Sequence, residues 1–262
     1  MLQYLSGAAL AYVCALALFL GAALGSFLNC AAWRVVRHES FVRGRSRCPD
    51  CGHVLGFLDL VPVFGWLILR GKCRYCGKKI PARYPLTELV FALVTLACVL
   101  RCDLTLLCAR NLAFLACLFM LSLTDLDERI IPDGCLLAAA LIWAATAPFL
   151  YETWAEAGKS LLAALVCGGG ILGVSLVMDK VLGRESLGGG DIKLFAVVGL
   201  YLGLVGTLFA VLLACVLGLL LALALKKTRE AFPFGPAIAA AAAIMLLWGG
   251  GLVSWYLGLF AL

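Results

Sequence analysis

Long apolar segments separated by short polar ones run through almost the whole chain. The apolar segments lie at 4–29, 86–100, 104–123, 134–150, 159–178, 194–225 and 235–260. A helix needs about 20 apolar residues to cross the hydrocarbon core of a bilayer, and these segments approach or exceed that length. A helix also satisfies its own backbone hydrogen bonds in lipid. The pattern therefore predicts an all-α polytopic membrane protein.

The segment 194–225 is too long for one ordinary span and short for two. A single span would place Lys226, Lys227 and Arg229 outside, against the rule that basic loops stay in the cytoplasm. Two short helices that turn near 203–206 would return these bases to the cytoplasm. We therefore expect eight transmembrane helices.

The composition supports a membrane protein. Hydrophobic residues make up 64% of the chain and charged residues 14%, with a mean hydropathy of +1.06. A soluble domain carries roughly 25% charged residues. So few charges cannot cover the surface of a soluble domain of this size, and lipid must surround most of the chain.

The positive charge is concentrated in one stretch. The net charge is +6, and 11 of the 21 Lys and Arg residues lie in 34–83. Nucleic-acid binding is one interpretation of such a stretch, but the positive-inside rule explains it more simply and predicts a cytoplasmic loop with no nucleic-acid partner.

Because 1–29 contains no Lys or Arg, we interpret it as a signal anchor with its N-terminus outside. The expected domains are a first transmembrane helix at 1–33, the cytoplasmic loop at 34–85 and a membrane domain of about seven helices at 86–262.

Alternation from that loop orients the other connections. It predicts that 125–133 and 179–193 lie inside, and that 101–103 and 151–157 lie outside. Arg110 follows an apolar stretch on the outer side. We expect its long side chain to snorkel to the outer headgroups.

Four of the 13 cysteines are spaced as two pairs. Cys48 and Cys51, with Cys73 and Cys76, form a C-x2-C-x21-C-x2-C array. Two such pairs supply the four thiolates of a tetrahedral Zn²⁺ site. The cytosol disfavours disulfides, so a structural zinc is the stronger prediction, and a metal-free loop is the alternative. The other nine cysteines fall singly in or beside apolar segments, where Cys is a small packing residue.

Two acids flank apolar segments on the same expected side of the membrane. Asp125 follows the third segment, and Asp191 follows three glycines and precedes the sixth. An acid at a bilayer boundary is costly and is a candidate functional group. Two close carboxyl groups share one proton, so one can activate water while the other polarises a peptide carbonyl. The alternative is that Asp125 ends a helix and the glycines form a flexible turn.

Three neighbouring charges have other expected roles. Asp127 is the rival of Asp125, but residues two positions apart on a helix point about 200° apart, so only one can face Asp191. We expect Asp133 to cap the N-terminus of the next helix. The positive charge of Lys193 either sets the local electrostatic field near Asp191, or its side chain simply snorkels to the headgroups.

Short motifs occur in series along most of the chain. They are Gly25-Ser26-Phe27-Leu28-Asn29 with Arg34, Pro49 and Gly52 around the first Cys pair, Arg70-Gly71-Lys72-Cys73, Arg83-Tyr84-Pro85-Leu86-Thr87-Glu88, the acidic segments 125–133 and 188–193, and Pro233-Phe234-Gly235-Pro236. In these motifs the chain resembles the bacterial type IV prepilin peptidases, GxGD-type aspartic proteases of the inner membrane. The archaeal preflagellin peptidases share the aspartate motifs, but the four-Cys loop favours the bacterial branch.

The resemblance implies an activity and its partners. It implies that Asp125 and Asp191 are the catalytic pair, and that the substrates are prepilins or pseudopilins cut after a Gly, behind a basic leader. It also implies N-methylation of the new N-terminus with S-adenosylmethionine, although no methyl-donor site can be assigned to particular residues.

Two other classes of protein remain open at this point. An ion-coupled transporter also has intramembrane acids and Gly-broken helices. However, the charges here gather at one membrane face, and no inverted repeat is visible. A zinc-bearing assembly component of a secretion or pilus machine would tolerate replacement of both aspartates.

Overall fold

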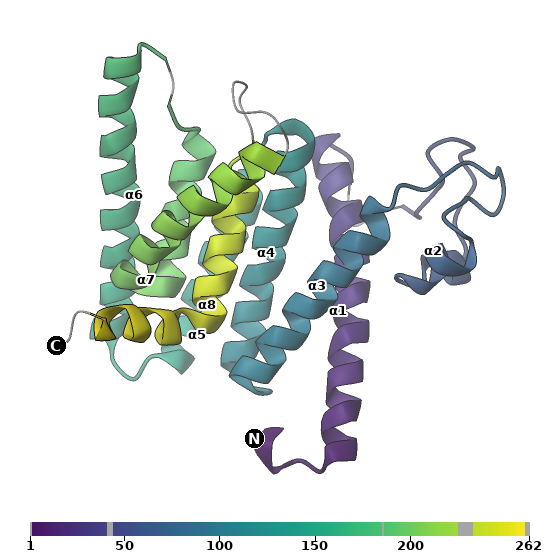
Figure 1. Ribbon diagram of the computed structural model, residues 1–262, viewed down its shortest axis with the longest axis horizontal. Coiled ribbons are helices and arrows are strands. Elements are labelled where there is room, and N and C mark those ends of the chain that lie inside the picture. Colours follow the sequence, from purple (N-terminus) through teal and green to yellow (C-terminus); the bar gives the residue numbers. More distant parts are fainter. Residues whose placement is uncertain (1, 41–43, 185, 225–232, 260–262) are drawn as a thin grey trace. The chain divides into compact units, whose positions relative to one another are not determined.

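The computed structural model describes residues 2–40, 44–184, 186–224 and 233–259. Within these residues the regular structure is helical, apart from two isolated β-bridges. The elements are η1 (Leu2–Tyr4), α1 (Gly7–Val36), η2 (Phe57–Leu60), α2 (Phe64–Ile68), α3 (Arg83–Cys102), α4 (Leu106–Glu128), α5 (Asp133–Leu150), α6 (Trp154–Leu182), α7 (Gly189–Ala224) and α8 (Gly235–Gly258) (Figure 1). The predicted all-α fold is confirmed.

Seven of these helices are long and apolar enough to cross a membrane. They are α1 and α3 to α8, and each contains one of the predicted apolar segments almost completely. Helices α3 and α6 extend beyond their apolar segments into the polar flanks at both ends. The prediction of a polytopic helical membrane protein is therefore confirmed.

Helix α7 is interrupted where the sequence predicts a turn. Gly203 has φ 67° and ψ −177°, a conformation that glycine adopts without a Cβ clash. Figure 1 shows the chain reversing direction there, so that both ends of α7 lie at the same end of their unit. The break in 194–225 is thus confirmed, and α7 consists of two helices. The bases Lys226, Lys227 and Arg229 lie outside the described residues, so the eight-span topology stays a prediction.

The chain divides into two compact units, Met1–Cys108 and Ala109–Leu262. In the first unit α1 packs closely on α3 through two glycines one helical turn apart. A Cβ added to Gly21 would lie 2.8 Å from the Cα of Ala92, and one added to Gly25 would lie 3.1 Å from the Cα of Glu88. This spacing of small residues lets two helix backbones approach in lipid.

The second unit packs α7 against α6 and α8. A Cβ on Gly199 of α7 would lie 2.7 Å from the Cα of Ala164 in α6, so this contact also needs glycine. The interior of the unit is formed by fully buried apolar side chains of α4, α7 and α8, among them Phe114, Leu118, Leu121, Leu194, Val198 and Ile238. Tight packing of these helices fixes the positions of the polar groups at their ends.

Arg110 corrects one expectation. Its side chain does not snorkel to a surface, because the residue is only 7% exposed and packs inside the second unit. Helix α4 begins at Leu106, so Arg110 lies in the second helical turn and not at a frayed end.

Candidate active site and metal centre

Asp125 lies in the last turn of α4 and faces the interior of the second unit. The residue is 6% exposed, and its Oδ2 accepts a 2.8 Å hydrogen bond from the backbone N–H of Gly235, the first residue of α8. Asp127, two positions further on, is exposed. The prediction that only one of the two acids turns inward is confirmed, and the inward one is Asp125.

Asp191 lies in the first turn of α7. Its backbone N–H donates to the carbonyl of Gly188 at 3.0 Å. Its Oδ1 is buried and has no hydrogen-bond partner among the described residues. The carboxyl groups of Asp191 and Asp125 are close enough to interact electrostatically. The end of α4 and the starts of α7 and α8 lie at one end of the unit (Figure 1), which fits the expected convergence of the two acids.

Two glycines make room for this arrangement. A Cβ on Gly235 would lie 2.7 Å from Oδ2 of Asp125, and a Cβ on Gly190 would lie 2.9 Å from the Cβ of Ile131. Any larger residue at Gly235 would therefore push the Asp125 carboxylate out of its position. The sequence places Gly235 in a motif, but its distance from Asp125 in the chain, 110 residues, gives no sign of this contact.

Asp133 corrects a further expectation and forms an unexpected contact with Lys193. Asp133 does not cap α5, because Pro132 occupies the cap position and no side-chain cap hydrogen bond is present. Its Oδ1 instead accepts from Nζ of Lys193 at 2.7 Å, with both side chains exposed. Lys193 thus forms an ion pair that was not expected, and its two expected roles stay predictions. An exposed pair of this kind contributes at most about 1 kcal/mol.

Two acids that share a buried end of a helix bundle can perform general acid–base chemistry. Repulsion between two close negative charges favours the state with one proton on the pair. The ionised carboxylate can then take a proton from water, and the protonated one can donate to a carbonyl oxygen. The unpaired Oδ1 of Asp191 leaves one acceptor available for such a proton.

The four paired cysteines gather in the first unit. Their Sγ atoms all lie within 4.8 Å of one another, and Cys48 and Cys76 are 3.9 Å apart. A tetrahedron with Zn–S bonds of about 2.3 Å has sulfur–sulfur edges of about 3.8 Å. The four sulfur atoms therefore fit a tetrahedral metal ion, and the predicted ligand set is brought together.

Each cysteine pair is held by the same backbone turn. The N–H of Cys48 donates to the carbonyl of His53 at 2.9 Å, and the N–H of Cys73 donates to the carbonyl of Lys78 at 2.8 Å. Gly52 and Gly77 follow the second cysteine of each pair with φ of 70° and 73°. Glycine is the residue that tolerates this left-handed backbone.

The Cys48 thiol is prepared for metal binding. The backbone N–H of Cys51 is the main cause that lowers its pKa to about 7. At Cys76 the Lys78 N–H is outweighed by burial and by hydrogen bonds with the other thiols, which raise the pKa of Cys76 to about 12, so Cys48 is the thiol that ionises first. A thiolate is the form that binds metal, so a lowered pKa favours binding at neutral pH.

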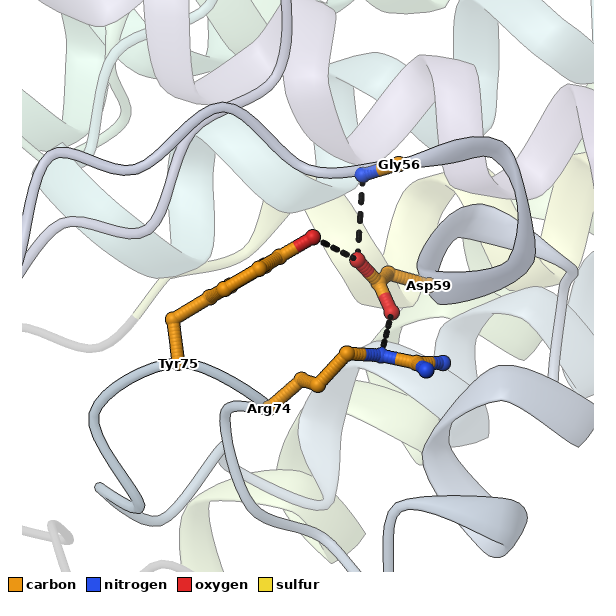
Figure 2. A network of polar contacts seen from close by, with 4 residues as sticks. All are labelled: Gly56, Asp59, Arg74 and Tyr75. Carbon is orange, nitrogen blue, oxygen red and sulfur yellow. Dashed lines mark hydrogen bonds and ion pairs between the residues drawn. The ribbon is translucent and has the colours of Figure 1, made fainter.

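Asp59 ties the second cysteine pair to the rest of the loop (Figure 2). Its Oδ1 accepts from Nε of Arg74 at 2.7 Å, and its Oδ2 accepts from the Tyr75 hydroxyl at 3.2 Å and the Gly56 N–H at 3.0 Å. Burial raises the pKa of Asp59, but the hydrogen bonds and the charge of Arg74 outweigh it and hold that pKa below its usual value. The carboxylate is therefore ionised and fully paired.

Two further contacts join the cysteine pairs directly. Lys78 donates to Oδ1 of Asp50 at 2.6 Å, and the rings of His53 and Tyr75 stack with centroids 3.6 Å apart. These contacts show that side chains as well as the metal ligands order the loop. Sequence reasoning missed them, because they depend on the mutual placement of the two pairs.

A cavity of about 880 Å³ lies within the first unit. It is bounded by the end of α1, the cysteine loop and the start of α3, and its lining includes Asn29, Trp33, Arg34, Trp66, Tyr84 and Glu88. Glu88 is buried and accepts from the N–H of Val63 at 2.7 Å, which holds a turn in which Val63 has φ 61°. The cavity has the size of a small-molecule site.

The fold and the paired acids define a multi-pass membrane protein with two carboxyl groups that can act as the general acid and general base of a peptidase. Family profiles match two parts of the chain: "Bacterial Peptidase A24 N-terminal domain" at 19–102 and "Type IV leader peptidase family" at 112–223. The chain belongs to the type IV leader peptidase family, and its seven long apolar helices together with this membership indicate a multi-pass inner-membrane protein.

Several relatives carry the name prepilin leader peptidase/N-methyltransferase. The protein of Bacillus subtilis (strain 168) is 32% identical over 248 residues, which are 90% of this chain and 95% of that protein. That of Myxococcus xanthus (strain DK1622) is 39% identical over 210 residues, 78% of this chain and 62% of that protein. That of Aeromonas hydrophila is 33% identical over 224 residues, 81% and 74% of the two chains. No solved structure matches the chain.

Proposed function

We propose that this protein cleaves the basic leader from type IV prepilins or pseudopilins and then N-methylates the new N-terminus. The names of its relatives and its family membership support both activities. The observation that carries the peptidase assignment is the meeting of Asp125 and Asp191 at one end of the second unit. A transporter is not favoured, because both acids lie at helix ends and not at mid-depth of the unit.

Asp125 and Asp191 take different roles in this proposal. The Gly235 N–H stabilises the ionised form of Asp125, so Asp125 takes the proton from the attacking water. Asp191 holds the shared proton and donates it to the oxygen of the scissile carbonyl. The proton taken from water then passes to the leaving amine, and no covalent intermediate forms.

The proposed topology explains why the substrate reaches these acids. A basic leader stays in the cytoplasm by the same charge rule that retains the 34–83 loop there. The bond between the leader and the apolar pilin helix then lies near the cytoplasmic headgroups. We place both aspartates at that depth and the N-terminus of the chain on the outer side.

Co-expression with candidate prepilins tests both activities at once. The mass of the mature pilin shows whether the leader has been removed and whether one methyl group has been added. A full-length, unmodified prepilin beside abundant wild-type protein, for every candidate substrate, would contradict the proposal.

For the metal centre we propose a structural Zn²⁺ held by Cys48, Cys51, Cys73 and Cys76. The sulfur geometry and the lowered pKa of Cys48 support it. Four thiolates fill the coordination shell, so the ion has no open position for a substrate and orders the loop. Metal analysis of purified protein should find about one zinc per chain.

For the methyl donor we propose the cavity of the first unit as the binding site. S-adenosylmethionine supplies an electrophilic methyl group on a sulfonium cation. Aromatic faces attract cations, and the guanidinium of Arg37 already lies 4.2 Å from the ring centre of Trp33. Trp33 and the acidic Glu88 line the cavity and can bind and orient a cationic donor.

Equilibrium dialysis with labelled S-adenosylmethionine tests this site. Trp33→Ala should abolish binding, whereas Trp154→Ala, which removes an exposed ring in the second unit, should not change it. Equal binding by wild type and Trp33→Ala would place the donor elsewhere.

A further inference from the structure

Arg110 is a buried cation at the end of the second unit opposite the two aspartates. It precedes Asp125 by 15 positions on α4, a separation of about 22 Å along the helix axis. It is 7% exposed, and its Nε and Nη1 have no hydrogen-bond partner among the described residues. The peptidase and methyltransferase proposals do not use this residue.

Aromatic rings surround the guanidinium but do not neutralise it. The ring centres of Tyr151 and Tyr201 lie 5.9 and 5.6 Å from its central carbon. The hydroxyl of Tyr201 donates to the carbonyl of Ala139 at 2.8 Å. The oxygen of Tyr151 accepts from Nε1 of Trp143 at 3.2 Å. The two tyrosines therefore offer Arg110 their π faces and not their oxygens.

No acid among the described residues pairs with Arg110. Near Tyr151, Glu152 lies in the connection between α5 and α6 and Glu156 in the first turn of α6, and both are exposed. Glu156 instead accepts from the backbone N–H of Glu152 at 3.2 Å. Cation–π contacts close to their limit of about 6 Å stabilise a cation only weakly. Removing a guanidinium from water costs far more, so the charge requires an anion.

We propose that Arg110 binds the phosphate of a phospholipid at this end of the second unit. The 23 residues of α4 span about 35 Å, close to the thickness of the hydrocarbon core, and Arg110 lies about 6 Å from the first residue of the helix. The buried guanidinium therefore lies about one helical turn inside the adjacent headgroup layer, and a lipid phosphate reaches it by entering between the helix ends. Its planar fork of N–H donors matches two oxygens of one phosphate. The tyrosine rings cover the remaining faces of the guanidinium.

The test compares three proteins that have been freed of lipid in a neutral detergent. They are wild type, Arg110→Met, and Lys159→Gln, which removes an exposed cation near the same end of the unit. The thermal unfolding midpoint is followed while phosphatidylglycerol is added, and in a separate arm while inorganic phosphate is added. The apparent affinity for phosphatidylglycerol should fall at least about tenfold in Arg110→Met and stay unchanged in Lys159→Gln.

A crossover in stability distinguishes this proposal from a purely structural role. Without lipid, Arg110→Met should unfold at the same temperature as wild type or higher, because an unpaired buried charge has been removed. With phosphatidylglycerol, wild type should become the more stable of the two. An equal lipid-induced shift in both proteins would overturn the proposal. An equal shift with inorganic phosphate would overturn the assignment to a lipid.

Native mass spectrometry of the wild-type protein gives a readout that needs no variant. Protein extracted in mild detergent should retain one phospholipid after exchange into lipid-free detergent. Folded wild-type protein that retains none, at an unchanged unfolding midpoint, would overturn the proposal even if Arg110→Met failed to fold.

Discussion

The two units assemble their reactive groups in different ways. In the first unit all four thiols come from one short stretch, Cys48 to Cys76, and a repeated backbone turn presents each pair. In the second unit Asp125, Asp191 and the Gly235 N–H come from three helices far apart in the chain. The metal centre thus depends on local turns and the ion, whereas the acid pair depends on helix packing. Damage to one should leave the other largely intact.

Replacing either acid of the pair is the strongest test of this separation. Asp125→Asn and Asp191→Asn should each lower prepilin cleavage by about 10²- to 10⁴-fold, because general acid–base catalysis is lost. Asp127→Asn, which changes an exposed acid of the same helix end, should retain substantial activity. Cleavage is measured with purified protein at equal amounts.

The same variants should still methylate a pilin whose leader has already been removed. Loss of methylation in Asp125→Asn would show that the two units do not act separately. An active Asp125→Asn beside an inactive Asp127→Asn would show that the first catalytic aspartate is assigned wrongly.

Removing two thiols tests the first unit. Cys48→Ser with Cys51→Ser should abolish stoichiometric zinc binding and make 34–83 sensitive to proteases, because metal binding and folding of such a small unit are coupled. Methylation should also fall, because the cysteine loop bounds the proposed methyl-donor cavity. Cleavage should fall only as far as the protein becomes unstable.

The matched control is Cys215→Ser, which removes an exposed thiol of α7 and should change neither zinc content nor proteolysis. A well-folded, zinc-free enzyme that has lost cleavage would assign the metal a role in the chemistry of the second unit.

Gly235→Ala tests how closely the acid pair depends on helix packing. The added Cβ would lie 2.7 Å from Oδ2 of Asp125, so the carboxylate must move. Small displacements of catalytic groups reduce rates strongly, and cleavage should fall by about 10- to 100-fold. Gly250→Ala adds a methyl group to the same helix where nothing lies within 4 Å, and it should leave cleavage unchanged. Equal activity of the two variants would show that the Asp125 position tolerates movement.

The same contrast explains what the sequence could predict. Spacing within a short stretch predicts the cysteine cluster, and hydropathy with the positive-inside rule predicts the break that the structure shows at Gly203. Helical periodicity predicts that only one of Asp125 and Asp127 turns inward, and the family resemblance implies that it is Asp125. The contact of Gly235 with Asp125 and the burial of Arg110 were missed, because they depend on which helices pack together.

The smallest effect is expected from Tyr75→Phe in the first unit. The change removes one of the three hydrogen bonds to Asp59 and keeps the ring that stacks on His53. Arg74 and the Gly56 N–H still hold the carboxylate. A single hydrogen bond contributes about 1 kcal/mol, so zinc affinity should fall by less than about tenfold.

Competition with a chromophoric chelator measures this affinity, and Tyr12→Phe, at an exposed position of α1, is the control. A loss of zinc affinity greater than tenfold would mean that the tyrosine hydroxyl orders the whole loop. The contact of Arg74 with Asp59 would then be insufficient to hold the second cysteine pair. No change at all would mean that the other two donors suffice to hold Asp59. Prepilin cleavage by Tyr75→Phe should equal that of wild type, whatever the change in zinc affinity. Reduced cleavage would contradict the proposal that the cysteine loop and the acid pair depend on separate interactions.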